Sequence, residues 1–395
     1  MIKTSVPRIE PFRAVRYRPG TDLGMVSAPP YDVISPEEQA RLEKSHPSNI
    51  IHVTLGTERP GDDIAENRYS RAASTFRKWL ETGLLVADAE PHLYLYRSDF
   101  SVEGRPRATA GIVAALELEE LGAGAVFGHE KTRPGPKADR LALIRTTRAN
   151  LEPLWFFASR AIEGFRDLVD DLAEVDPAAD VLDPYDVRHR LWILPDHQAA
   201  RLGKLMNDVP LVVADGHHRY ETCLTYREER RATDGPGPWD STLALIADPL
   251  QFAPELLPIH RLVSDLPVSR IPGLKLFGGS FDELRQAVED AGAGTIGVAS
   301  AEGRWTLETS AEVDTVWLAD QVLEPNRADV TYEHDIEIVE RAVRDRGTVA
   351  FLMAPVPVPL VADKALAGVR LPPKTTLFWP KPRTGLILRD LDADS

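Results

Sequence analysis

The sequence Leu-Val-Val-Ala-Asp-Gly-His-His-Arg-Tyr occupies residues 211–220 and joins an apolar run to a dense group of polar side chains. The apolar run is typical of a buried strand and stops at Asp215, and the segment 220–230 that follows has the composition of a helix. Gly216, between them, can adopt backbone dihedral angles that other residues avoid. The stretch therefore predicts a strand that turns sharply into a helix, a basic unit of an α/β fold.

The side chains at this turn are suited to binding an anion. His217, His218 and Arg219 can donate hydrogen bonds to phosphate or carboxylate oxygens, and the first amides of a helix attract negative charge. Asp215 can hold a metal ion or orient a histidine. A simple turn with solvated histidines is the structural alternative.

The chain has 395 residues, more than a single hydrophobic core usually serves, and we expect two lobes. Strand-like and helix-like segments alternate along it, which predicts a mixed α/β (α+β) fold with a mixed sheet. We expect an N-terminal lobe at residues 1–190 and a C-terminal lobe at residues 191–395, with the site between them. No apolar run reaches the length of a membrane span and residues 1–7 lack a signal-peptide segment, so we expect a cytoplasmic protein without membrane contact.

The charge of the chain disfavours nucleic acid as its main partner. Asp and Glu number 61 against 46 Lys and Arg, and the net charge is −15. A polyanion needs an extended basic face, whereas a local cationic pocket suits a small anionic or phosphorylated metabolite. The single cysteine, Cys223, excludes an intramolecular disulfide.

A second candidate site element is the loop that carries Tyr31 and Asp32. Two prolines precede it, and Ser35 and Pro36 begin a helix expected over residues 36–45, so the loop is stiff and presents an acid. A structural turn is the alternative reading. Residues 49–55 follow as an expected strand that contains His52.

A third element is the basic loop at residues 129–140, which contains four fixed cations and two acids in an acidic chain. Lys131, Arg133 and Arg140 could bind phosphate or carboxylate groups, and Glu130 could act as a general base. A solvated charged loop is the alternative.

Four motifs resemble the bacterial and archaeal family known as domain of unknown function 1015. They are Ala-Pro-Pro-Tyr-Asp-Val-Ile-Ser at 28–35, His-Glu-Lys-Thr-Arg-Pro at 129–134 with Asp139-Arg140, Ala-Asp-Gly-His-His-Arg-Tyr at 214–220, and Pro-Pro-Lys-Thr-Thr at 372–376 with Pro380-Lys381. They lie in the family's order and span most of the chain, and Thr375 stands where the family usually has Ser. No activity is assigned to the family.

A shorter resemblance bears on mechanism. Residues 215–219 look like the phosphate-binding corner of the ParB and sulfiredoxin superfamily, which includes free serine kinases, sulfiredoxins and CTP-binding partition proteins. The resemblance implies that Gly216, His217, His218 and Arg219 contact nucleotide phosphates.

These observations lead to one hypothesis, a kinase that uses Mg²⁺ and a nucleoside di- or triphosphate to phosphorylate a small hydroxyl-bearing metabolite such as serine. Residues 216–219 with Lys131, Arg133 and Arg140 would bind phosphate, Asp215 or Asp32 would hold Mg²⁺, and Glu130, Asp32, His217 and His218 are the catalytic candidates.

Three alternatives remain open. They are a phosphomonoester hydrolase of the phosphoserine type, a ParB-like nucleotide- or nucleic-acid-binding module, and a metal site built on His217, His218 and His129. Adjacent histidines point in divergent directions on most backbones, which disfavours the metal site.

Overall fold

The computed structural model describes residues 6–132, 134–206, 209–344 and 347–393, and these form two compact units. The first unit comprises residues up to 128, residues 132–254 and the C-terminal segment from residue 380. The second unit comprises residues 129–131 and 255–379. The division differs from the expected boundary at residue 190, because strands on both sides of that residue belong to one sheet in the first unit.

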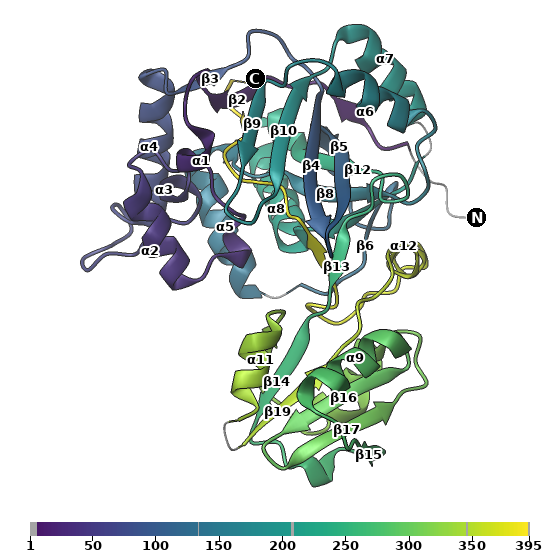
Figure 1. Cartoon of the computed structure of the whole chain (residues 1–395). Helices are drawn as coiled ribbons and strands as arrows, with labels where there is room; N and C mark the ends of the chain where they lie inside the picture. Colours follow the sequence, from purple (N-terminus) through teal and green to yellow (C-terminus); the bar gives the residue numbers. More distant parts are fainter. Residues whose placement is uncertain (1–5, 133, 207–208, 345–346, 394–395) are drawn as a thin grey trace. The chain divides into compact units, whose positions relative to one another are not determined.

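That sheet has nine strands, and eight of them follow the order β6-β11-β8-β12-β5-β4-β10-β9 (Figure 1). β6 pairs in parallel with β11, and β8 with β12, while the other pairs are antiparallel, so the sheet is mixed as expected. β1 (Ile9–Glu10) pairs with β5 beside this path. The remaining bounds are Val126–Gly128 for β6, Leu211–Asp215 for β11, Leu154–Ala158 for β8, Ser241–Ala247 for β12, Arg105–Glu117 for β5, Tyr94–Val102 for β4, Arg188–Ile193 for β10 and Ala179–Leu182 for β9.

Two hydrophobic clusters of described residues stabilise the first unit. One packs the sheet against α6 (Phe165–Ala173), α7 (Asp196–Leu205) and α8 (His217–Asp234), and includes Tyr220, Trp192 and Phe156. The other joins α2 (Pro36–Ser45), α3 (Ile51–Thr54) and α4 (Arg68–Glu81) to a four-stranded sheet of β3 (Leu85–Ala87), β2 (Ala14–Tyr17), β21 (Leu388–Asp390) and β7 (Ala149–Asn150). Because β21 is a strand of this small sheet, the C-terminal segment is part of the first unit.

The helix expected at residues 36–45 is confirmed, with the Ser35 side chain accepting from the Glu38 amide. The strand expected at residues 49–55 is wrong, because His52 lies in the short helix α3. Asn49 explains the difference, since its side chain accepts from the Ile51 amide at 3.0 Å and donates to the Met25 carbonyl at 2.8 Å. A short apolar run fits a strand or a buried helix equally well, and the local bond of Asn49 just before the N-cap Ile50 favours the helix.

The second unit contains a six-stranded antiparallel sheet in the order β15-β17-β16-β19-β14-β18. Helices α9 (Phe281–Ala291) and α11 (Ile336–Ala342) pack on it through a cluster that includes Leu284 and Val339. The strand bounds are Leu274–Leu276, Gly303–Glu308, Thr295–Ser300, Thr348–Leu352, His260–Ser264 and Val330–Glu333 in the order of the sheet. β13 (Glu255–Leu257) pairs separately with β20 (Leu377–Trp379).

Candidate functional site

The expected strand-to-helix corner is confirmed: β11 ends at Asp215 and α8 begins at His217. Gly216 joins them with a φ of 99°, in the left-handed region that favours glycine. A Cβ atom at this position would lie 2.8 Å from Cδ2 of Leu154. The pairing of β11 with β8 also shifts register between Val213 and Asp215, an irregularity that re-aims the last side chain of the strand.

Asp215 and Asp32, which are distant in the sequence, bind the same lysine. The Lys381 ammonium donates to Oδ1 of Asp215 at 2.6 Å and to Oδ2 of Asp32 at 2.6 Å. The Lys381 side chain is 7% exposed, against 20% and 22% for the two carboxylates. Burial by itself would lower the pKa of Lys381, but the charges of Asp215 and Asp32 outweigh burial and raise it. The ammonium is therefore held in its charged form between two acids.

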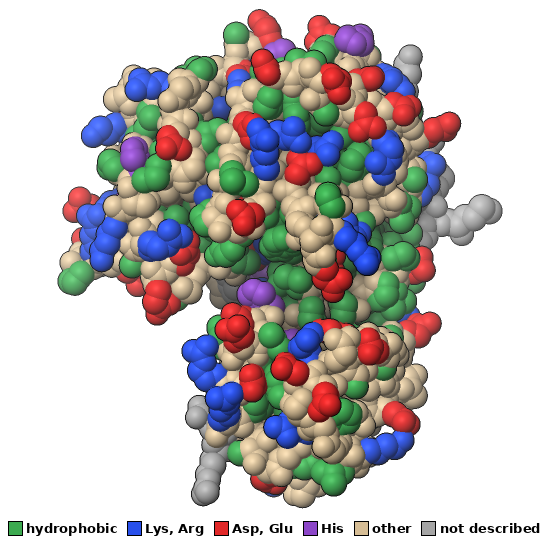
Figure 2. Space-filling view, in the orientation of Figure 1, with side chains coloured by type: hydrophobic (Ala, Val, Ile, Leu, Met, Phe, Trp, Pro, Cys, Tyr) green, Lys and Arg blue, Asp and Glu red, His purple; other side chains and the backbone are tan. Residues whose placement is uncertain are grey.

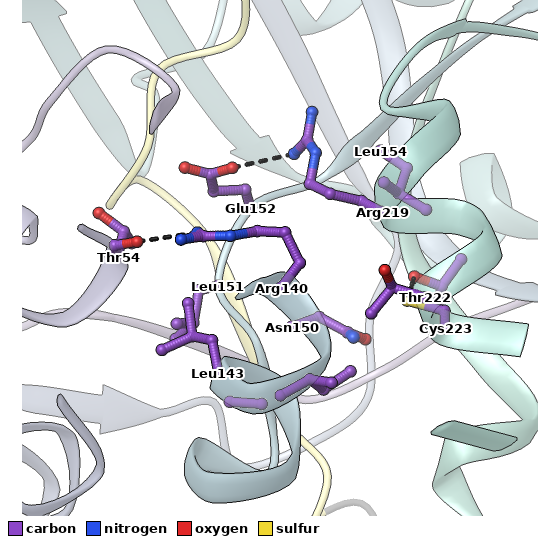
Figure 3. A pocket seen from close by; sticks show the side chains of 13 residues that line it. Thr54, Arg140, Leu143, Asn150, Leu151, Glu152, Leu154, Arg219, Thr222 and Cys223 are labelled. Carbon is purple, nitrogen blue, oxygen red and sulfur yellow. Dashed lines mark hydrogen bonds and ion pairs between the residues drawn. The ribbon is translucent and has the colours of Figure 1, made fainter. Parts of the chain in front are cut away.

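Arg219 extends this charged group towards the interior. Its guanidinium donates to Oδ2 of Asp215 at 2.8 Å. It also donates to Oε2 of Glu152 at 3.0 Å (Figure 3). The other Glu152 oxygen accepts from the Tyr31 amide at 3.3 Å and from the Thr384 hydroxyl at 3.1 Å. Burial would lower the pKa of Arg219, and the two carboxylates raise it instead. Glu152 thus ties together the loop of Tyr31, the corner of Arg219 and the C-terminal segment.

We call the five residues Asp32, Glu152, Asp215, Arg219 and Lys381 the acid–lysine site. Three of the sequence motifs contribute to it, while Glu152 belongs to none of them. Glu152 was missed by the sequence analysis, although a glutamate before a fully apolar strand such as β8 is an unusual choice that could have pointed to it.

The Asp139-Arg140 pair of the second motif borders the same site. The Arg140 guanidinium lies 4.0 Å from the centre of the Tyr31 ring and donates to the Thr54 carbonyl at 2.8 Å. Asp139 accepts from Nε of Arg140 at 2.7 Å and from the Tyr69 hydroxyl at 2.8 Å. Burial raises the pKa of Asp139 and the nearby Arg140 lowers it, with a net fall. Burial raises the pKa of Tyr31 to about 12.

Arg140 and Arg219 were expected to bind an external anion, and the structure gives both of them carboxylate partners within the chain. A cavity of about 60 Å³ lies beside them (Figure 3). Its lining includes Arg140, Glu152, Arg219, Asn150 and Cys223. A space of this size holds a few water molecules, which could solvate the buried ends of the ion pairs.

Three of the predicted residues lie in the second unit. His129, Glu130 and Lys131 belong to the second unit, where the His129 ring lies 2.9 Å from the Thr376 hydroxyl and the Lys131 amide donates to the Leu371 carbonyl at 3.1 Å. The predicted meeting of Glu130 and Lys131 with Asp215 therefore stays a prediction.

The other predicted site residues are His217, His218 and Arg133. His217 is 5% exposed and His218 is half-buried in the first turn of α8. Arg133 lies outside the described residues.

The expected Mg²⁺ site does not fit the acid–lysine site as it stands. Asp32 and Asp215 direct one oxygen each to the Lys381 ammonium, so an ion between them would have to displace the lysine. No group of three His, Cys, Asp or Glu side chains arranged for a metal ion occurs in the described parts of the chain, which include His129, His217 and His218. Nor do the helices described here include one that is both long and apolar enough for a membrane span.

Solved structures match the chain with low sequence identity and TM-scores below 0.5. Among solved structures, a mutant free serine kinase in complex with ADP matches with 10% identity and a TM-score of 0.39, over 64% of this chain and 84% of the other. SbnI from Staphylococcus aureus, truncated at its C-terminus, matches with 11% identity and a TM-score of 0.36, over 70% of this chain and 81% of the other. A conserved hypothetical protein from Pyrococcus furiosus matches with 11% identity and a TM-score of 0.37, over 64% of this chain and 87% of the other.

No curated protein matches the chain. A family model described as a protein of unknown function, DUF1015, matches residues 9–331. This match spans most of the chain and includes residues of both units, and the chain belongs to the DUF1015 family.

Proposed function

We propose that the chain is a phosphoryl-handling enzyme, a nucleotide-dependent kinase of a small hydroxyl-bearing metabolite such as serine. The observation that supports it best is the placement of the Lys381 ammonium, 2.6 Å from Asp32 and from Asp215, next to the first turn of α8. Phosphoryl transfer needs positioning and charge neutralisation more than a covalent nucleophile, and the acid–lysine site offers both.

Each part of the site has a role in this proposal. The terminal phosphate of the nucleotide binds at the N-terminus of α8, an 18-residue helix whose peptide dipoles favour an anion there. Lys381 stabilises the negative charge on the phosphoryl group during transfer. His218, half-buried in the same turn, contacts a phosphate oxygen in this scheme.

Asp32 is the proposed base, because Asp215 also holds Arg219 through its second oxygen, whereas Asp32 is 22% exposed beside Lys381. It accepts the proton of the substrate hydroxyl as that oxygen forms a bond to the γ-phosphorus. The bond from the γ-phosphorus to the bridging oxygen breaks at the same stage, and the nucleoside diphosphate leaves. Glu130 remains the alternative base from the sequence, now as a residue of the second unit.

The surface offers less support for a nucleic-acid-binding module. Basic and acidic side chains are interspersed on the face drawn in Figure 2, and the described residues form no continuous basic stripe there. A protein that follows a phosphate backbone needs such a stripe.

The test is incubation of the purified chain with ATP and a panel of hydroxyl metabolites that begins with serine, with phosphorylated product detected by mass spectrometry. We expect a phosphomonoester product from the wild type and a fall in kcat of about 100-fold or more in Asp32→Asn. Asp170→Asn, an exposed carboxylate change in α6, is the matched control and should keep full activity. Full activity in Asp32→Asn, or no product with any metabolite, contradicts the proposal. Release of phosphate from phosphoserine without nucleotide would favour the hydrolase instead.

A further inference from the structure

The segment that carries Lys381 is held rigidly against the loop of Asp32. Pro380 and Pro382 flank the lysine and restrict the backbone on both sides. Thr384 pairs with Ala28 through two backbone hydrogen bonds of 3.1 and 2.9 Å, although the two residues lie at opposite ends of the chain. Lys381 is therefore a fixed part of the site rather than a mobile surface lysine.

Neighbouring bonds strengthen this attachment. The Arg383 amide donates to the Tyr96 hydroxyl at 2.8 Å, and the Arg383 guanidinium donates to the Ser27 hydroxyl at 2.7 Å. Arg383 is 4% exposed and Tyr96 is 2% exposed, so these bonds are shielded from water. The position of the ammonium is thus set by buried contacts on its C-terminal side.

The net charge of the acid–lysine site depends on the ammonium of Lys381. Asp32, Asp215 and Glu152 contribute three negative charges, and Lys381 and Arg219 contribute two positive charges, a sum of −1. Without Lys381 the sum would be −2, on carboxylates that are only 6% to 22% exposed. Two carboxylates on a rigid scaffold with that charge match what Mg²⁺ or Mn²⁺ needs, oxygen ligands at about 2.0–2.1 Å for Mg²⁺.

We propose that Lys381 is the resident cation of the acid–lysine site, an ammonium that takes the place of a divalent metal ion between Asp32 and Asp215. Removing it turns the carboxylate pair into a divalent-cation site. The wild-type chain binds no divalent ion at this pair. This inference does not rest on the proposed kinase activity.

The experiment titrates the full chain with Mn²⁺ without any nucleotide, and follows free Mn²⁺ by electron paramagnetic resonance and the melting temperature in parallel. Lys381→Met is the test variant. Lys44→Met, an exposed lysine change in the last turn of α2, is the matched control. We expect Lys381→Met to gain one saturable Mn²⁺ site, tighter by about tenfold or more than any site in the wild type, and to melt at a higher temperature with Mn²⁺ than with EDTA. Adding Asp32→Asn to Lys381→Met should remove the gain.

Two results overturn the inference. One is a folded Lys381→Met, with a wild-type circular dichroism spectrum, that gains no Mn²⁺ site. The other is a Mn²⁺ site in the wild type that disappears in Asp32→Asn, and this comparison remains decisive if Lys381→Met does not fold. Neither result involves nucleotide or turnover, so the inference and the proposed kinase activity can fail separately.

Discussion

Replacing Glu152 by glutamine should destabilise the first unit, because this residue joins three segments of the acid–lysine site. The carboxylate accepts from Arg219 at 3.0 Å, Thr384 at 3.1 Å and the Tyr31 amide at 3.3 Å, and its side chain is 6% exposed. Glutamine keeps the shape and one oxygen, but it places an amide donor where one carboxylate oxygen accepted. The variant therefore loses one acceptor and the charge of the pair.

These contacts set the size of the expected loss in the free energy of unfolding. A hydrogen bond to a charged group contributes about 1.5–3 kcal/mol, and breaking a buried ion pair costs about 3–5 kcal/mol. Arg219 keeps its bond to Asp215 at 2.8 Å, which offsets part of the loss. We expect the free energy of unfolding to fall by about 2 kcal/mol and the melting temperature to fall by about 4 °C or more.

Urea unfolding followed by fluorescence measures this change, with Asp170→Asn as a control that should stay within about 0.5 kcal/mol of the wild type. The loss in Glu152→Gln should persist at high salt, because buried pairs are screened much less than exposed ones. A loss below about 0.5 kcal/mol, or one that vanishes with salt, is the behaviour of a surface ion pair. Either result would refute the view that Glu152 holds the site together.

Three other predictions concern single positions. Gly216→Ala should lower the free energy of unfolding by about 2–3 kcal/mol in urea titrations, and the control Gly61→Ala by only about 1 kcal/mol. Both residues have a positive φ, but only Gly216 is crowded by a neighbouring side chain. Equal losses in the two variants would contradict the role of crowding. Burial lowers the pKa of His260 from 6.5 to about 4, so the unfolded chain takes up this proton at a higher pH than the folded chain does. The free energy of unfolding should therefore fall by up to about 3 kcal/mol as the pH drops from about 6.5 to about 4. His260→Asn, whose side-chain oxygen can still accept from the Met353 amide, should remove this part of the pH dependence, and an unchanged profile would contradict it. Burial raises the pKa of the Cys223 thiol, so native protein should react with a thiol reagent far more slowly than protein in urea, and rapid reaction of the native protein would argue against its burial.

Local patterns in the sequence determined the elements whose residues are near neighbours. The helix at residues 36–45 followed from Ser35, Pro36 and Glu38, and the corner at Gly216 followed from an apolar run that stops at an acid and a glycine. The antiparallel pairing of β4 and β5 around the turn at Gly104 is likewise a contact between neighbouring segments. These features depend on backbone propensities and caps that act over a few residues.

Only the tertiary structure decided which charges meet. Lys381 lies 349 positions from Asp32 and 166 from Asp215, and Glu152 lies 67 positions from Arg219. No local pattern records such distances, so Arg219 was expected to bind an external anion, whereas in the fold it pairs with the remote Glu152. The physical reason is that an ion pair depends on the distance between two atoms in space, and the packing of remote segments sets that distance.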